Sequence, residues 1–237
     1  MRWAVLSPHP DDAVLSCWHL LRAAGPGVVV NVFTGVPSAG TPVGWWDRLG
    51  RAGDAGDRAR ARICEDREAL ALAGRSPVNL GLLDGQYRDA LAVTPVLDRL
   101  GAAVAGCAVL YAPAALGAHP DHVLVRDAAL TLRRRGHEVR LYADLPHAIR
   151  HGWPDWVSGD ANAVAARMWA DGLARAGPEV AAGMPMVHVL DEAEREHKLR
   201  AVRAYRTQLQ ALEAVGFPSF SVPGVWRYEV TWELVPR

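Results

Sequence analysis

Short apolar stretches alternate with longer segments of helical pattern along most of this chain. The apolar stretches are rich in valine and leucine, and we expect strands at Trp3–Ser7, Val28–Thr34, Val78–Leu82, Ala108–Ala112 and Val139–Ala143. We expect helices at Asp11–Ala24, Ala59–Ala73, Thr94–Ala105, Pro120–Arg135 and Ala163–Ala176. Such alternation predicts repeated strand–helix units and a parallel sheet, and valine-rich strands are typical of a sheet covered on both faces. The expected fold class is therefore α/β, with a mostly parallel central sheet flanked by helices.

The C-terminal part of the chain predicts one more helix and one more strand. Asp191–Ala214 carries apolar residues at helical spacing, and Val225–Val235 alternates partly, as an edge strand does. Three segments are expected to be loops: Pro37–Gly56, Leu145–Asn162 and Phe217–Gly224. A length of 237 residues suits a single domain, 1–237. The helix and strand from about residue 190 are expected to pack on its core.

Charge and cysteine content argue against several classes of function. Lysine plus arginine equals aspartate plus glutamate at 26 each, so no electrostatic feature favours nucleic acid or an anionic membrane. No apolar run reaches transmembrane length, and the apolar start is too short for a signal peptide. Three cysteines without paired spacing favour a reducing compartment. We expect a cytoplasmic protein that acts on a small molecule, without membrane insertion; a homo-oligomer is possible.

The motif His-Pro-Asp occurs twice, each time between an expected strand and an expected helix. The first copy is His9-Pro10-Asp11-Asp12 and the second is His119-Pro120-Asp121-His122. Proline is favoured at the first position of a helix, and acidic residues in the first turn suit the helix dipole. Both motifs therefore belong at helix N-termini, at the edge where parallel strands end and ligands bind in open α/β folds.

These residue types are those of a catalytic metal site. His9 and Asp12 can converge in a first helical turn, and His122 adds a second imidazole. Three protein ligands and an open position for water distinguish catalytic zinc from structural zinc, although the same set also suits ferrous iron. Asp11 is placed to take a proton from that water. His119, as an imidazolium, could stabilise an oxyanion or protonate a leaving amine.

A single His-Pro-Asp needs no metal, because a helix start with an acidic first turn explains it. Two copies at equivalent junctions favour a metal site over that simpler interpretation.

The two motifs resemble the signature motifs of a known family. Ser7-Pro-His-Pro-Asp-Asp-Ala-Val-Leu-Ser-Cys17 and Gly117-Ala-His-Pro-Asp-His122 are similar to those of the LmbE-like superfamily, which includes N-acetylglucosaminyl-phosphatidylinositol de-N-acetylase (PIG-L). Weaker resemblances lie in three segments, 62–74, 80–88 and 198–208. The resemblance implies a Rossmann-like fold, bound zinc and hydrolysis of N-acyl groups. Carried over by motif, the metal ligands are His9, Asp12 and His122, the general base is Asp11, and the electrostatic or acid group is His119.

The chain departs from the family pattern at two positions. Ala13 follows Asp12 where the family more often has glutamate, and Gly117 stands where some members have a tyrosine that helps hold the intermediate. A hydrogen-bond donor at the second position must therefore come from elsewhere or be missing.

Further residues are candidates for substrate binding. Asp84 resembles a family aspartate at a strand end, although a turn aspartate explains it equally well. Arg88 could hold a sugar or phosphate oxygen, and Asp144 and His147, which follow the fifth expected strand, could line the same pocket mouth. Aromatic faces suit sugar or acyl groups; the candidates are Trp45, Trp46, Trp153 and Trp156. Lys198, Tyr205 and Gln208 are expected to brace the last helix.

The sequence favours one function and leaves two alternatives open. The leading hypothesis is a zinc-dependent hydrolase that removes an N-acyl group, most simply acetyl, from an amino sugar or glycosylated metabolite. The first alternative is an amidase acting on a thiol conjugate or a long-chain N-acyl natural product, for which tryptophan-bearing loops could form an apolar wall. The second is a non-catalytic sugar-binding domain on the same fold.

Overall fold

The computed structural model describes residues 1–181, 183–216 and 224–235. Its seven strands form one sheet in the order β3-β2-β1-β4-β5-β7-β6. β1 to β5 run parallel, and β7 runs antiparallel to both β5 and β6. The strands are β1 (Trp3–Ser7), β2 (Gly27–Asn31), β3 (Pro77–Asn79), β4 (Val109–Pro113), β5 (Glu138–Tyr142), β6 (Met184–Val189) and β7 (Tyr228–Glu233). The expected α/β fold with a mostly parallel sheet is confirmed.

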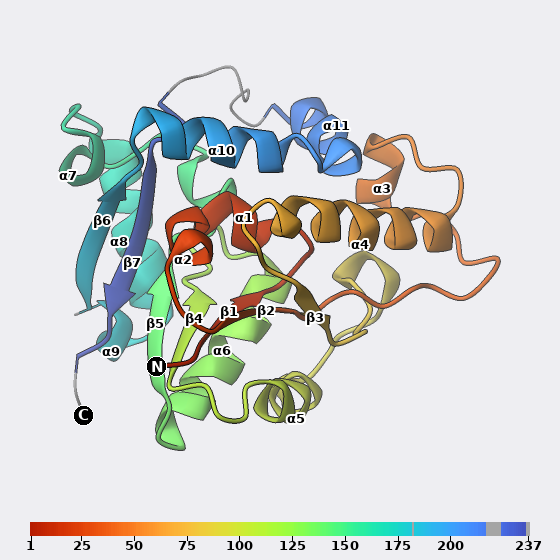
Figure 1. Cartoon of the computed structure of the whole chain (residues 1–237), viewed down its shortest axis with the longest axis horizontal. Helices are drawn as coiled ribbons and strands as arrows, with labels where there is room; N and C mark the ends of the chain where they lie inside the picture. The colour runs from red at the N-terminus through yellow and green to blue at the C-terminus, as the bar shows by residue number, and fades with distance from the viewer. Residues whose placement is uncertain (182, 217–223, 236–237) are drawn as a thin grey trace.

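Helices cover both faces of the sheet (Figure 1). α1, α2, α4 and α10 lie on one face, and α5 and α6 pack together on the other. The α-helices are α1 (Asp12–Ser16), α2 (Trp18–Arg22), α3 (Trp45–Leu49), α4 (Ala55–Ala71), α5 (Val93–Ala103), α6 (Pro120–Arg134), α7 (Asp155–Ser158), α8 (Ala163–Arg175), α9 (Pro178–Ala181), α10 (Glu192–Val202) and α11 (Arg206–Ala214). Two 3₁₀ turns are η1 (Gly85–Tyr87) and η2 (His147–Ile149).

The C-terminal strand differs from the sequence prediction. β7 was expected at an edge, but it pairs with β5 on one side and with β6 on the other. The edge strand at this end of the sheet is β6, which was not expected because it contains Pro185 and lacks an alternating pattern. Proline is tolerated at a sheet edge, where its missing N–H costs no ladder hydrogen bond.

Two expected helices are each divided into two. The first breaks at Cys17, because the backbone N–H groups of Trp18 and His19 donate to the buried carboxylate of Glu229, at 2.8 and 2.9 Å. The last breaks between Val202 and Arg206, and there the backbone N–H of Thr207 donates to the buried carboxylate of Glu65 at 3.2 Å. In both places a carboxylate from a distant part of the chain accepts a backbone N–H next to the break.

The three expected loops have different outcomes. Residues 37–56 contain α3 and the start of α4, and residues 145–162 contain η2 and α7. The expected connector Phe217–Gly224 lies outside the described residues except for its last position. Within the described ranges no helix has the length and apolar character needed to cross a membrane.

The topology places the two His-Pro-Asp motifs side by side. β1, which precedes the first motif, is the parallel neighbour of β4, which precedes the second. The chain builds the sheet outward from β1 through β2 and β3, then returns to add β4 and β5 on the other side. The strand order therefore reverses between β1 and β4, which is where ligands bind in folds of this class.

Candidate metal and catalytic site

The turn after β1 is held by short local hydrogen bonds. The hydroxyl of Ser7 donates to the carbonyl of His9 at 2.7 Å and accepts from the N–H of Ala13 at 3.1 Å. The N–H of His9 donates to Asp12 Oδ2 at 2.8 Å. Asp11, at the N-cap of α1, has φ 142° and ψ −36°. A non-glycine residue in this region costs of order 1–3 kcal/mol, and such strain clusters at functional sites.

The turn after β4 begins α6 and sets the ring of His119. His119 is the N-cap of α6 and Pro120 follows at the first helical position. His119 Nδ1 accepts from the N–H of Asp121 at 3.3 Å. Since that nitrogen is an acceptor, the proton of a neutral ring belongs on Nε2, which can donate to a ligand.

His9, Asp12 and His122 are buried and offer ligand atoms that all lie within 4.8 Å of one another. Asp12 Oδ2 is 3.4 Å from His9 Nδ1 and 3.4 Å from His122 Nε2. His122 Nε2 is buried and makes no hydrogen bond with any described residue. An orphaned imidazole nitrogen beside a carboxylate and a second imidazole is what a bound zinc or iron ion would satisfy. The residues present therefore fit a metal.

A second grouping of His9, His119 and Asp121 also satisfies the distance criterion. It is the weaker candidate because Asp121 is already paired with Arg88 and accepts from the N–H of Gly85 at 3.0 Å.

Two further carboxylates orient the imidazoles. Asp121 Oδ2 contacts His9 Nε2 at 3.0 Å, and Asp144 Oδ2 contacts His122 Nδ1 at 3.0 Å. Asp144 is fully buried and also accepts from the N–H of Leu116 at 3.0 Å. Each imidazole therefore joins Asp12 to a second aspartate, an arrangement that fixes ring orientation in metal sites.

The carboxylates give this cluster an affinity for positive charge. Burial by itself lowers the pKa of His9, but contacts with Asp12, Asp121 and Asp84 outweigh it and raise this pKa well above its usual value. Burial also acts to lower the pKa of His122, but the charge of Asp12 outweighs it, and this pKa is raised as well. The pKa of Asp12 falls well below its usual range because the two imidazoles outweigh the effect of burial. A cation is the matching ligand for such a field.

The two expected catalytic groups have strongly shifted pKa values. Burial, reinforced by the neighbouring charge of Asp12, raises the pKa of Asp11 to about 8. Burial, reinforced by His9 and His122, lowers the pKa of His119 to about 3. In the protein without a bound metal, His119 is therefore neutral near pH 7 and can donate a hydrogen bond; its expected role as an imidazolium stays a prediction. Asp11 is poised to gain or lose a proton near neutrality.

A cavity of about 510 Å³ opens at this site. Asp11, Asp12, His9 and His119 line it together with side chains from α3, η1, η2 and α11. Its apolar wall includes Trp45, Trp46, Pro120, Pro146 and Leu212. Cavities of this size hold small ligands.

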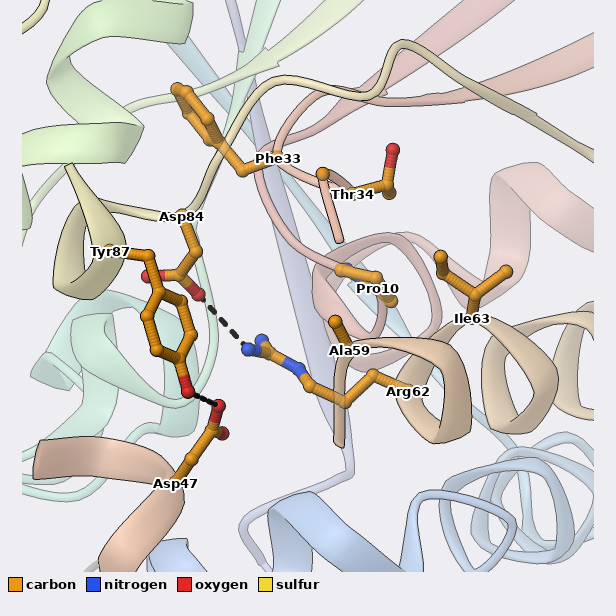
Figure 2. A pocket seen from close by; sticks show the side chains of 10 residues that line it. Pro10, Phe33, Thr34, Asp47, Ala59, Arg62, Ile63, Asp84 and Tyr87 are labelled. Atoms are coloured by element: carbon orange, nitrogen blue, oxygen red, sulfur yellow. Dashed lines mark hydrogen bonds and ion pairs between the residues drawn. The ribbon is translucent and has the colours of Figure 1, made fainter. Parts of the chain in front are cut away.

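Asp84 and Arg88 also line the cavity, and both are engaged by protein groups. Asp84 Oδ2 accepts from Arg62 Nη1 at 3.0 Å (Figure 2). Burial alone would raise the pKa of Asp84, but the charges of His9 and Arg62 outweigh this effect. The pKa of Asp84 therefore lies well below its usual range. The guanidinium of Arg88 donates to Asp121 and lies 4.8 Å from the centre of the Phe33 ring. Neither side chain is a loose surface group.

Figure 2 draws a second, smaller pocket, which shares Arg62 and Asp84 with the cavity, and it shows how Asp47 of α3 is attached to Tyr87 of η1. The hydroxyl of Tyr87 donates to Asp47 Oδ2 at 2.6 Å and accepts from the N–H of Gly44 at 3.2 Å. Trp46 Nε1 donates to Gln208 Oε1 at 2.9 Å, which ties α3 to α11. The two tryptophans of α3 are thus held at the cavity wall from two sides.

The structure brings most of the sequence candidates together, but not all of them. Asp144 lies behind His122 instead of at the pocket mouth, because the chain after β5 turns inward and buries it completely. Trp153 and Trp156 lie outside the cavity lining and contact Trp169. Lys198 braces α10 through Glu229 at 2.6 Å, as expected.

Sequence reasoning missed two residues of the site. Asp121 lies inside the second motif, but its role requires His9 to face it from the first. Arg62 was noted only as part of a weak resemblance, and its partner Asp84 is 22 positions away. His147, expected with Asp144 at the pocket mouth, does line the cavity. Its ring centroid lies 5.0 Å from that of His122 and 5.2 Å from that of His119.

Comparison with solved structures supports the fold over the full chain. A deacetylase for the A40926 pseudoaglycone matches with a TM-score of 0.74 and 27% identity, covering 99% of this chain and 97% of that chain. A triple mutant of a deacetylase from the teicoplanin biosynthetic pathway matches with a TM-score of 0.76 and 26% identity, covering 99% and 98%. The N,N'-diacetylchitobiose deacetylase of Pyrococcus horikoshii, at 14% identity and a TM-score of 0.54, covers 97% and 82% and shares the fold.

Sequence comparison identifies the family. A 2'-N-acetylparomamine deacetylase of Streptomyces fradiae is 32% identical over a match that covers 62% of this chain. The match spans only 58% of that protein's length. The family model described as GlcNAc-PI de-N-acetylase matches residues 4–132, which include both His-Pro-Asp motifs. The chain belongs to the PIG-L family.

Proposed function

We propose that this protein is a zinc-dependent N-deacetylase that removes an acyl group, most simply acetyl, from an amino sugar or a glycosylated small metabolite. The observation that carries the proposal is the grouping of His9, Asp12 and His122, with an orphaned nitrogen on His122, beside a strained and buried Asp11. Family membership supports it, and so do the similar proteins, because the curated relative and the two solved structures of 27% and 26% identity described above are deacetylases.

A metal bound by these three residues lowers the pKa of water and polarises a carbonyl group. Asp11 accepts a proton from the water whose oxygen bonds to the acyl carbon. As the carbon–nitrogen bond breaks, Asp11 returns that proton to the amine nitrogen, so a carboxylic acid and a free amine leave. His119 donates a hydrogen bond from Nε2 to the acyl oxygen, which gains negative charge during the attack.

Without a bound metal, burial and the charge of Asp12 raise the pKa of Asp11 to about 8. A cation held by Asp12 would favour the ionised form of Asp11, which is the form that accepts the proton. The same ligand set accommodates ferrous iron, so iron is the alternative metal.

The cavity wall supplies groups for a sugar. We propose that Asp84 and Arg88 contact hydroxyl oxygens of the substrate, because both line the cavity and both are held in place by protein partners. Asp144 is proposed as a positioning residue for His122 instead, since it lies outside the cavity lining and is fully buried.

A longer acyl group is the second candidate substrate. Trp45, Trp46, Pro146 and Leu212 provide an apolar wall in the same cavity, and an apolar chain needs such a surface. Comparison of N-acetyl and N-octanoyl glucosamine separates the two candidates. A preference for acetyl supports the leading proposal, and a preference for octanoyl supports the second.

We retain the expectation of a cytoplasmic location, which the unpaired Cys17, Cys64 and Cys107 support. A homo-oligomer stays a prediction.

The proposal is tested by amine release from 2'-N-acetylparomamine and N-acetylglucosamine, with and without a chelator. Asp11→Asn should retain the metal and lose at least about 100-fold in kcat, because the proton acceptor is gone. Asp98→Asn makes the same change at an exposed position of α5 and should leave the rate unchanged. Full activity of Asp11→Asn would refute the general base. Sugar binding without turnover in any metal-loaded sample would favour a binding domain instead.

A further inference from the structure

Gly117 and His147 lie against each other in the loops that follow β4 and β5. A Cβ atom added to Gly117 would lie 2.8 Å from Cβ and 3.5 Å from Cγ of His147. The backbone of Gly117 does not itself need glycine, because its φ is not positive. Glycine at position 117 is therefore explained by the space that His147 occupies, and not by a backbone conformation that only glycine adopts.

The space next to Gly117 directs His147 toward the reaction centre. His147 begins η2, lines the cavity, and is partly exposed within it. Its ring centroid lies 5.0 Å from that of the metal ligand His122 and 5.2 Å from that of His119. His119 and His147 both line the cavity with their ring centroids 5.2 Å apart, while His122 is fully buried and not part of the lining. An acyl group bound in the cavity next to the proposed metal ligands would therefore be near both rings.

We propose that His147 is a further catalytic residue, which donates a hydrogen bond to the acyl oxygen of the substrate as negative charge develops there. The inference deepens the proposed deacetylase function and rests on it. A neutral imidazole has one donor and one acceptor nitrogen, so one can face the protein while the other faces the substrate. Two donors on one oxygen are the usual construction of an oxyanion hole, and His119 with His147 make such a pair. Residue 117 must be glycine in this arrangement, because a larger side chain would contact His147.

The first test removes the hydrogen-bond donor of residue 147 while keeping a planar ring. His147→Phe retains a planar ring without a donor, and His147→Gln returns an N–H near the position of Nε2. Loss of one oxyanion donor lowers kcat by about 100-fold or more. We expect this loss in His147→Phe, with KM changed less than about threefold and metal content unchanged, and partial recovery in His147→Gln. His151→Ala removes an exposed histidine four positions away and serves as the control.

The second test uses the contact with Gly117. Gly117→Ala should displace His147 and lower kcat about as much as His147→Phe does. The new methyl group at position 117 would contact Cβ of His147, and His147→Ala would keep that atom. His147→Gly removes it and therefore removes the contact. Gly117→Ala added to His147→Gly should therefore cause no further loss. Additive losses would contradict the assigned contact.

A measurement without turnover separates this inference from the proposed function. Acetate, the product acid, presents the oxygens that His147 is proposed to contact, and its binding to zinc-loaded protein is measured by calorimetry. We expect acetate to bind the wild type about tenfold more tightly than His147→Phe, whether or not a sugar substrate is turned over. Equal acetate binding, or an equal kcat in both proteins, would overturn the role of His147. An inactive wild type that shows the acetate difference would refute the proposed substrate alone.

Discussion

His9 and His122 share one carboxylate oxygen, since Asp12 Oδ2 lies 3.4 Å from Nδ1 of His9 and 3.4 Å from Nε2 of His122. The other nitrogen of each ring contacts a second aspartate, Asp121 or Asp144, at 3.0 Å. The three proposed ligands are therefore held in place before any ion arrives. Such preorganisation is what a rigid metal site requires.

Asp144 should control how tightly the metal is held. Asp144→Asn removes the charge that orients His122 and makes its ring more basic, and loss of such a partner costs about 10–100-fold in metal affinity. Competition with a fluorescent zinc chelator measures the change. Asp127→Asn, a half-exposed change on the same helix α6, should leave the affinity as it is. An unchanged affinity in Asp144→Asn would remove the positioning role.

The buried carboxyl group of Asp11 should destabilise the folded protein as pH rises. Burial, with the charge of Asp12, raises its folded pKa from 3.8 to about 8. The folded state therefore binds this proton more tightly than the unfolded state does, and stability is lost as pH rises from about 4 to about 8. In chelated protein, Asp11→Asn should be more stable than wild type at pH 8 by about 1 kcal/mol or more, and this gain should shrink by pH 5. Urea unfolding at the two pH values measures it; an equal difference at both would contradict the raised pKa.

The buried pair of Lys198 and Glu229 should hold α10 against β7. Lys198 Nζ donates to Glu229 at 2.6 Å, and both side chains are fully buried. Removal of one partner of a buried pair costs about 3–5 kcal/mol, so Lys198→Met should be strongly destabilised. Arg200→Met, on the exposed side of the same helix, should change stability by less than about 0.5 kcal/mol.

The same pair predicts an acid-dependent loss of stability. Burial alone would raise the pKa of Glu229, but the charge of Lys198 outweighs this effect. The pKa of Glu229 therefore falls from 4.5 to about 2. A depressed carboxyl pKa contributes stability that is present above about pH 4.5 and lost as pH falls toward 2. Urea titrations between pH 5 and 2 should show a steeper loss in wild type than in Glu229→Gln, because Asp12 and Asp84, whose pKa values are also lowered, contribute to the decline in both. A parallel decline in both proteins would contradict it.

Tyr87 should act on substrate binding through α3. Its hydroxyl bonds the buried Asp47 and the N–H of Gly44, next to Trp45 and Trp46. Tyr87→Phe should reduce stability by about 1–2 kcal/mol, because Asp47 loses a partner. It should also raise KM several-fold with kcat nearly unchanged, because the cavity wall loosens while the reacting groups stay. Tyr228→Phe, on β7, serves as the control. A fall in kcat alone would contradict this account.

Much of the architecture and of the metal site was predictable because their signals are local. β1, β2, β4 and β5 appear as short apolar runs, and the helix starts after β1 and β4 appear as His-Pro-Asp. β6 was not predictable, since it has Pro185 and a largely exposed surface in place of an alternating pattern. The helix breaks at Cys17 and before α11 involve the carboxylates of Glu229 and Glu65, which the sequence places far away.

The residues that support the site were harder to predict for the same reason. The pairing of His9 with Asp121 spans 112 positions, and that of His122 with Asp144 spans 22. Only the sheet order brings such partners together. The lowered pKa of His119, about 3, also depends on burial beside other imidazoles, which no local pattern records.

The most direct test of the account is the metal content of purified protein, compared between wild type and His122→Phe, with chelator-sensitive acetate release measured on the same samples. We expect about one zinc or iron ion per wild-type chain, little or none in His122→Phe, and acetate release that follows the metal. Equal metal content in the two proteins, or release that persists after the metal is removed, would show that the two His-Pro-Asp motifs are helix starts and not the reaction centre.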